Sequence, residues 1–273
     1  MPERSKVTNV DADAVRDAFR RGWLGGAALR KEDEQKVAEL VPLLGEVARM
    51  ASKISTSVDP LTVVDLCAGK GALGVLSSLL VLRALGRKHV VRIIERDNKY
   101  AQRCIDAARI LGVHDDVSFH GTEVSARAAW PSARTDLVLA LHACGGASDD
   151  VIDTAIAADA RALLLVPCCY GAGPRHEGAG LDVTAQPIAD AWVARLPLPA
   201  HAIVGKRMAQ SFIDAERTLR LESAGYETEV VEAFTATLSP HNLLWRARRV
   251  KEPVRMQRAT DTLAALTSPQ AAR

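Results

Sequence analysis

Residues 62–74 read T-V-V-D-L-C-A-G-K-G-A-L-G, and this stretch decides the fold that the sequence predicts. An apolar run ends at Asp65, small residues follow, and a helical pattern begins at Ala72. That order is typical of a buried parallel strand, a tight turn and the N-terminus of a helix. The glycines let the backbone approach a ligand closely, and the free N–H groups at the helix start face it. We therefore expect a nucleoside ligand with polar hydroxyls or an amino-acid tail at this turn.

The glycine pattern is weak evidence on its own. Gly69, Gly71 and Gly74 match only part of G-x-G-x-x-G, because Cys67 stands where a first glycine is expected. The pattern G-x-x-x-x-G-K-S/T is absent from the chain, so a phosphate cradle of that type is unsupported. A purely structural turn in an α/β domain is the alternative at this point.

Outward from the turn, strand patterns alternate with helical ones, which predicts a mostly parallel sheet with helices on both faces. Two last strands are close enough in sequence to pair as an antiparallel hairpin. A helix after the fourth strand is expected to be capped by Ser148. The expected strands are 62–66, 90–95, 117–119, 136–141, 162–166, 226–234 and 242–250, and the other expected helices are 11–22, 31–51, 72–85, 99–111 and 206–223.

Residues capable of chemistry gather where these strands end. Ligands bind outside the carboxyl ends of the strands in such sheets, so the topology predicts one shared site. Glu95 lies about 20 residues after the glycine turn, where an acidic side chain accepts hydrogen bonds from ribose hydroxyls. The residues expected at this edge are Cys67, Glu95, residues 120–123, residues 142–144 and residues 168–170.

Composition excludes several classes of protein. The chain has 273 residues, of which 48% are hydrophobic and 25% charged, as in ordinary globular proteins. A net charge of +2 is too small to indicate nucleic-acid binding by itself. No apolar run approaches ~18 residues and the start lacks a secretory pattern, so we expect no membrane span and no leader. Five cysteines, an odd number, do not suggest a disulfide framework, which favours a reducing cytoplasm.

The predicted organisation has three parts. Residues 1–55 form a helical extension, residues 56–253 the α/β domain, and residues 254–273 a C-terminal tail. Residues 171–205 are rich in Gly and Pro and are expected to form an insertion into this domain. We expect it on the substrate side, because long loops in compact domains are usually functional or mobile. The N-terminal extension either covers the site, holds a substrate or only packs against the core.

The predicted element order, with D-L-C-A-G-K-G-A-L-G at 65–74, Glu95 and L-H-A-C-G-G at 141–146, resembles the class I methyltransferase fold that binds S-adenosyl-L-methionine. The resemblance covers about residues 31–250. V-P-C-C-Y at 166–170 and S-P-H-N-L-L at 239–244 are similar to one branch of methyltransferase-like proteins, which is itself similar to the tRNA 2′-O-methyltransferases that act at the acceptor stem.

The resemblance implies roles for residues at the strand ends. Asp65, Gly69 and Gly71 would line the methionine part of the cofactor, with Cys67 and Ala68 in the same turn. Glu95 would hold the ribose hydroxyls. The adenine would lie near Thr122 or Glu123, and the transferable methyl group between Leu141 and His142.

The sequence offers three kinds of chemistry beside the cofactor. His142 is the best candidate for a base, and the alternative is that it only hydrogen-bonds the cofactor or backbone. Cys144, Cys168 or Cys169 would be able to form a covalent adduct with a pyrimidine. These residues, with Cys67, are also zinc-type donors, but adjacent cysteines are poorly spaced for tetrahedral ligation and no C-x-x-C is present, so we predict no metal. Many methyltransferases that the chain resembles carry an N-P-P-Y motif where this chain has V-P-C-C-Y, and the asparagine of that motif holds the exocyclic amine of a base. Cys168 and Cys169 remove this asparagine, which disfavours methylation of a base amine by that route.

The expected function is therefore methyl transfer from S-adenosylmethionine to RNA, at a hydroxyl or a base. Basic residues cluster at 246–258 and would neutralise phosphates, or they simply lie in solvent. The alternatives are a small-molecule or protein methyltransferase of the same fold, and a non-enzymatic scaffold that binds the cofactor or nothing. The sequence does not indicate an oligomeric state.

Overall fold

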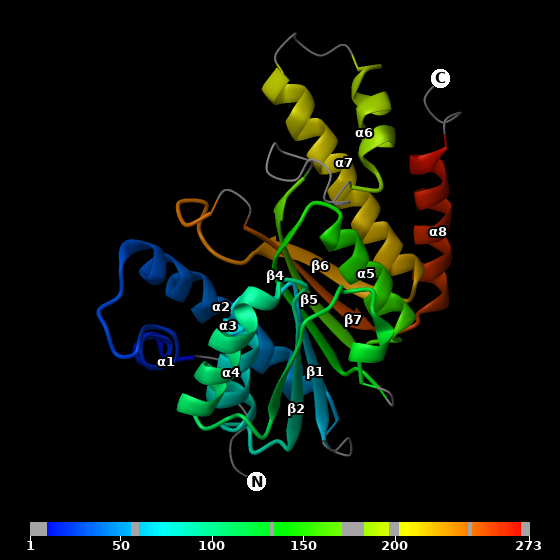
Figure 1. Ribbon diagram of the computed structural model, residues 1–273. Coiled ribbons are helices and arrows are strands. Elements are labelled where there is room, and N and C mark those ends of the chain that lie inside the picture. The colour runs from blue at the N-terminus through cyan, green and yellow to red at the C-terminus, as the bar shows by residue number, and fades with distance from the viewer. Residues whose placement is uncertain are drawn as a thin grey trace.

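The computed structural model describes residues 10–55, 60–131, 134–170, 183–196, 202–239 and 242–268. Its centre is a seven-stranded sheet with the strand order β3-β2-β1-β4-β5-β7-β6 (Figure 1). Strands β1 to β5 pair in parallel, whereas β7 pairs antiparallel with both β5 and β6. The predicted fold class is confirmed. The strands are β1 (Leu61–Leu66), β2 (His89–Ile94), β3 (Val117–His120), β4 (Leu137–Cys144), β5 (Ala162–Cys169), β6 (Tyr226–Glu232) and β7 (Leu243–Arg249).

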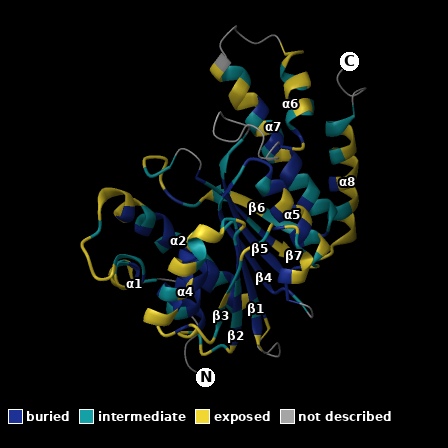
Figure 2. Cartoon of the chain, viewed as in Figure 1, coloured by how far each residue is buried: buried dark blue, intermediate teal, exposed yellow. Residues whose placement is uncertain are grey.

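Helices cover both faces of this sheet, as the alternating pattern predicts. Alternate residues of a strand point to opposite faces, so Val63 and Leu139 pack with the helices of one face, whereas Val64 and Val138 pack on the other. Figure 2 shows the central strands of the sheet as largely buried, and β1, β4 and β5 consist mostly of buried residues. The first face carries α1 (Ala12–Leu24), α2 (Lys31–Lys53), α3 (Ala72–Leu76) with a π-helical continuation (Ser77–Leu82), and α4 (Ala101–Ile110); the second carries α5 (Ala147–Ala157) and α7 (Ala202–Ser223).

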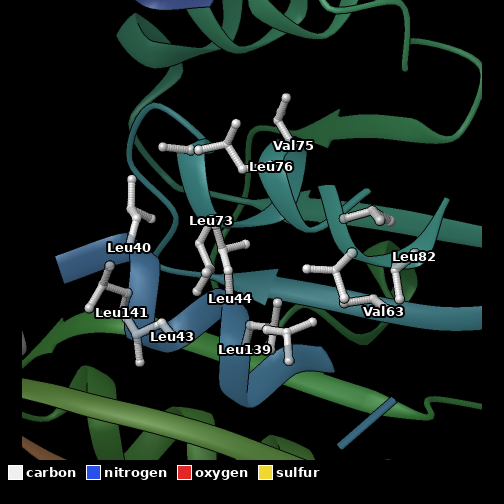
Figure 3. Close-up of a cluster of buried hydrophobic side chains, with 14 of the residues drawn as sticks. Leu40, Leu43, Leu44, Val63, Leu73, Val75, Leu76, Leu82, Leu139 and Leu141 are labelled. Carbon is white, nitrogen blue, oxygen red and sulfur yellow. The ribbon is translucent and has the colours of Figure 1, made fainter. Parts of the chain in front are cut away.

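Helix α2 is part of the core rather than a loose addition. Its apolar stripe contributes Leu40, Leu43 and Leu44, which lie among leucines of α3 and β4 in Figure 3. Full burial of one leucine contributes roughly 1.5–3 kcal/mol, so this stripe fixes the helix firmly on the sheet. Pro42 does not divide the helix, which runs unbroken past it.

Some elements differ from the expectation. Ser148 does not cap α5: Gly146 is the cap, and the Ser148 hydroxyl inside the helix donates to the Ala143 carbonyl at 2.7 Å. The helix expected at 72–85 is α-helical only to Leu76 and ends, after its π-helical part, at Leu82.

The C-terminal third adds helices at one end of the sheet. Helix α6 (Gln186–Val193) packs against α7, and α8 (Pro253–Thr267) also packs against α7 (Figure 1). Residues 171–182 and 197–201 of the predicted insertion lie outside the described residues, and the predicted division into domains stays a prediction. Short 3-10 turns occur at Asn98–Tyr100 and Arg127–Ala129. Among the described helices, none has both the length and the apolar character needed to cross a bilayer.

Candidate active site

The turn after β1 adopts the tight geometry that its small residues predict. Cys67, Gly69 and Gly71 all have positive φ angles, of 52°, 53° and 73°. A Cβ atom added to Gly71 would lie 2.6 Å from the Cys104 Sγ and 2.9 Å from the Ile93 Cδ1. Gly71 therefore allows the chain to turn into α3 directly against the core, whereas open space surrounds Gly69.

Asp65 lies beneath this turn and is buried. Its Oδ2 accepts a hydrogen bond from the Gly74 backbone N–H at 2.8 Å, while its Oδ1 has no hydrogen-bond partner among the described residues. Burial raises the pKa of Asp65 to about 7, against the lowering effects of that hydrogen bond and of the Lys36 charge. The unpaired oxygen makes Asp65 able to accept one more hydrogen bond at the glycine turn.

Glu95 connects β2 to the glycine turn. Its Oε2 accepts from the Gly69 N–H at 2.9 Å, and its Oε1 accepts from the Asp97 N–H at 2.9 Å. Each carboxylate oxygen retains a second lone pair, so Glu95 is positioned to accept from hydroxyl groups as well.

A cavity of about 210 Å³ opens at the carboxyl ends of β1, β2 and β4, and we call it the strand-end cavity. It brings together five of the predicted site residues: Cys67, Glu95, Glu123, His142 and Cys144. The other lining residues, Ile94, Arg96, Val124, Ala147 and Asp150, were not predicted as site residues.

The remaining predicted residues lie outside the lining of this cavity. Asp65 and Leu141 are buried in the protein interior, and Ala68 packs against the core. Gly69 and Gly71 shape the turn, and Thr122 lies beside Glu123 with its N–H donating to the His120 carbonyl. Cys168, which is bonded to the lining residue Cys144, is also absent from the lining.

His142 is held in an unusual position by a break in β4. The register of β4 against β5 shifts between Leu141 and Ala143, and His142 has a φ of 65°. This irregularity turns the ring so that its Nε2 lies 2.8 Å from the Oε2 of Glu39 on α2. A strained backbone at such a position is typical of functional sites.

Glu39 is the functional candidate that the sequence did not indicate. Its side chain is buried, and its Oε2 also lies 3.5 Å from the Lys36 Nζ. Burial raises the pKa of Glu39, but the hydrogen bond with His142 and the Lys36 charge outweigh that effect and hold its pKa below the usual range. The available signal was a glutamate on the otherwise apolar face of α2.

The cysteines differ from the expectation. A disulfide joins Cys144 and Cys168, whereas Cys67, Cys104 and Cys169 are free. The odd number of cysteines did not suggest a disulfide framework, and the structure has this one bridge, which the sequence analysis did not anticipate. A covalent role for Cys144 or Cys168 does not fit this structure, because a sulfur atom in a disulfide carries no thiolate to attack a base.

The basic cluster at 246–258 is largely paired with acidic side chains. Arg246 pairs with Glu46, Arg248 and Arg255 pair with Glu227, and Arg249 and Lys251 pair with Asp159. This pairing reduces the positive charge that the cluster offers to a phosphate backbone.

The fold agrees with comparisons to known proteins. A family model described as a methyltransferase domain matches residues 35–172, just over half of the chain. The chain belongs to this methyltransferase family. Its fold, with the mixed seven-stranded sheet, is that of the class I S-adenosylmethionine-dependent methyltransferases.

The curated relatives compared here are distant from this chain. The glutathione S-transferase C-terminal domain-containing proteins of Homo sapiens and Macaca fascicularis are 26% identical to it over 229 residues, or 79% of this chain and 32% of each relative. The chain thus spans about a third of the length of these curated relatives.

Solved structures show similarity of fold alone. A methyltransferase of Podospora anserina bound to SAH has a TM-score of 0.50 at 11% identity, covering 86% of this chain and 88% of the other. Magnesium protoporphyrin IX methyltransferase of Synechocystis, also with bound SAH, has a TM-score of 0.48 at 14% identity, covering 88% of this chain and 99% of the other.

Proposed function

We propose that this methyltransferase moves a methyl group from S-adenosylmethionine to a hydroxyl group of an RNA, with His142 as the base. The observation that carries the proposal is the strand-end cavity, where His142 and Glu95 line one space although they follow different strands. The cofactor supplies an activated methyl group, and the protein supplies alignment and a proton acceptor.

The residues present fit the cofactor. The unpaired Oδ1 of buried Asp65 and the open space around Gly69 leave the glycine turn able to receive a polar tail. Glu95 would hold the ribose hydroxyls with its free lone pairs, and Glu123 would lie on the adenine side. These roles follow from position and from the hydrogen-bonding capacity that remains at each residue.

The contact between His142 and Glu39 supports the assignment of a base. When Nε2 donates to the Glu39 carboxylate, the ring carries its lone pair on Nδ1. The carboxylate then fixes the ring orientation and stabilises the imidazolium that forms when Nδ1 takes the proton of the acceptor hydroxyl. His142 would hold this proton while a bound cofactor supplies the methyl group and leaves as its thioether, so the product oxygen would not remain protonated.

The RNA acceptor is supported by the sequence resemblance to tRNA 2′-O-methyltransferases. Against it stands the pairing of the arginines at 246–258, which favours a small-molecule acceptor. A second cavity of about 300 Å³ between α6 and α7 also favours a small acceptor, since its lining includes Tyr170, directly after β5, together with Asp190 and Lys206. Both acceptors use the same cofactor site.

The test is methyl transfer from labelled S-adenosylmethionine into separate fractions of cell extract: RNA, protein and small metabolites. The proposal is supported if the label enters RNA with the wild-type protein but not with His142→Ala. Mass spectrometry of that RNA should then identify a 2′-O-methylated nucleoside. Label in metabolites or protein would move the acceptor to that class. Cofactor binding with no transfer into any fraction would favour a scaffold and overturn the proposed activity.

A further inference from the structure

Three sulfur atoms gather at the rim of the strand-end cavity, at the ends of β4 and β5. The Sγ atoms of Cys144, Cys168 and Cys169 all lie within 4.8 Å of one another, and all three residues are half-buried. Cys144 also lines the strand-end cavity. Methyl transfer as proposed uses none of these sulfurs, so the cluster has no role in that reaction.

The irregular end of β4 explains how two adjacent cysteines reach one third cysteine. Side chains of consecutive residues in a regular strand point to opposite faces, so Cys168 and Cys169 would normally diverge. Here the register shifts between Ala143 and Cys144, and Cys144 lies opposite Cys169. The Cα atoms of Cys144 and Cys168 are only 5.2 Å apart. Cys168 and Cys169 are therefore able to share one metal site with Cys144, although their adjacent positions in the sequence were expected to be poorly spaced for tetrahedral ligation.

We propose that the reduced form of the protein binds one Zn²⁺ ion through the thiolates of Cys144, Cys168 and Cys169. Tetrahedral zinc with Zn–S bonds of about 2.3 Å needs sulfurs about 3.8 Å apart, a spacing within the span of this cluster. Three protein ligands leave the fourth position for a water molecule, as in zinc sites that remain open. Soft thiolate ligands select zinc over magnesium or calcium.

The surrounding hydrogen bonds hold the two cysteine-bearing segments together. The Gly145 N–H donates to the Cys169 carbonyl at 3.3 Å, which ties the two cysteine-bearing segments together. Arg217, which is fully buried, donates to the Gly145 carbonyl at 3.1 Å and lies over the ring of Tyr170, the residue after Cys169. The guanidinium of Arg217 is itself paired with buried Asp149, its Nε 2.9 Å from the Asp149 Oδ1, so its role at the cluster is to hold these backbone segments in place.

The disulfide and the metal exclude each other. With Cys144 and Cys168 bonded, only the Cys169 thiol remains, and one sulfur cannot hold the ion. A dithiol opens the disulfide in two exchange steps: its first thiolate attacks one sulfur to give a mixed disulfide, and its second thiolate displaces the other protein sulfur. The dithiol becomes a cyclic disulfide, the protein gains two thiols, and zinc binding releases the protons of these two and of the Cys169 thiol.

The test uses the full chain and measures metal rather than activity. The protein is reduced with a dithiol, and the dithiol is then removed under argon. The reduced protein is titrated with Cd²⁺ while the ultraviolet absorption of the Cd–thiolate bonds is followed. Zn²⁺ is then titrated against a chromophoric chelator. We expect one ion per reduced chain and none in the disulfide form.

Two variants distinguish this site from other thiols. Cys169→Ser keeps the disulfide pair and should weaken zinc binding at least about tenfold. Cys104→Ala, in the buried core on the face of α4, should bind as the wild type does. Zinc binding unchanged in Cys169→Ser, or absent from the reduced wild type, would overturn the proposal. Because neither readout involves methyl transfer, failure here leaves the proposed function untouched, and the reverse also holds.

Discussion

The Nε2 of His142 lies 2.8 Å from the Oε2 of Glu39, although 103 residues separate them in the chain. The contact joins the N-terminal helix α2 to the end of β4. Helix α2 therefore does more than pack against the sheet, since it places a buried carboxylate against the ring that lines the strand-end cavity. A helix that precedes the α/β core thus contributes to the geometry of the candidate site.

Replacing Glu39 by glutamine tests whether this contact positions the base. We expect kcat to fall at least about tenfold, because the amide neither fixes the same ring orientation nor stabilises the imidazolium. The affinity for S-adenosylmethionine, measured by calorimetry, should stay the same. Glu46→Gln is the matched control, because Glu46 lies on the same helix and pairs with Arg246 instead. Equal kcat values for the two variants would show that Glu39 is only structural.

Gly71→Ala should destabilise the protein far more than Gly86→Ala does. Both glycines have positive φ angles, which cost an alanine about 1–2 kcal/mol. Only at Gly71 does the new Cβ also collide with Cys104 and Ile93, and such overpacking adds about 1–3 kcal/mol. Urea unfolding of the two variants measures the difference. Equal losses in the free energy of unfolding would mean that the core beside Gly71 accommodates the added methyl group without a further cost.

Much of the site follows from periodicity and topology. The strands are predicted by short apolar runs, and parallel strands necessarily end at one edge of the sheet. For that reason Cys67, Glu95, Glu123 and His142, at the ends of different strands, were expected together and do line one cavity. None of these placements required knowledge of side-chain packing.

What the sequence did not predict depends on contacts between distant segments. Glu39 looks like one charge on an apolar helix face until the bulge in β4 turns His142 toward it. A second register shift, between Ala143 and Cys144, places Cys144 near Cys168, and spacing alone does not predict such shifts. The arginines at 246–258 look like a free basic surface because their partners Glu46 and Asp159 come from elsewhere in the chain.

Gly69→Asp should abolish binding of S-adenosylmethionine while leaving the fold intact. Among the described residues, apart from Gly69 itself and its two chain neighbours, no atom lies within 4 Å of the position of a new Cβ, so the side chain has room and the positive φ adds the strain. The added carboxylate would stand beside Glu95, which accepts from the Gly69 N–H, and would occupy the space proposed for the cofactor. Calorimetry with a circular dichroism control measures this, and retained binding would count heavily against the cofactor site.

Asp65 should make stability depend on pH between about 4 and 7. Burial raises its pKa from 3.8 to about 7, so the folded state binds this proton more tightly than the unfolded state does. Its contribution to the free energy of unfolding is complete below pH 3.8 and is lost as the pH rises through 7. Asp65→Asn cannot ionise, so we expect a flatter profile and a gain in stability over the wild type at pH 8.

Urea unfolding of both proteins across this pH range is the measurement. The comparison also needs a second variant, in which a carboxylate is removed elsewhere in the chain. Asp106→Asn serves as that control, because the Asp106 side chain on α4 is 45% exposed and its loss should leave the profile of the wild type unchanged. If Asp65→Asn and the wild type lose stability in parallel from pH 4 to 7, the buried carboxyl under the glycine turn is not the group that titrates.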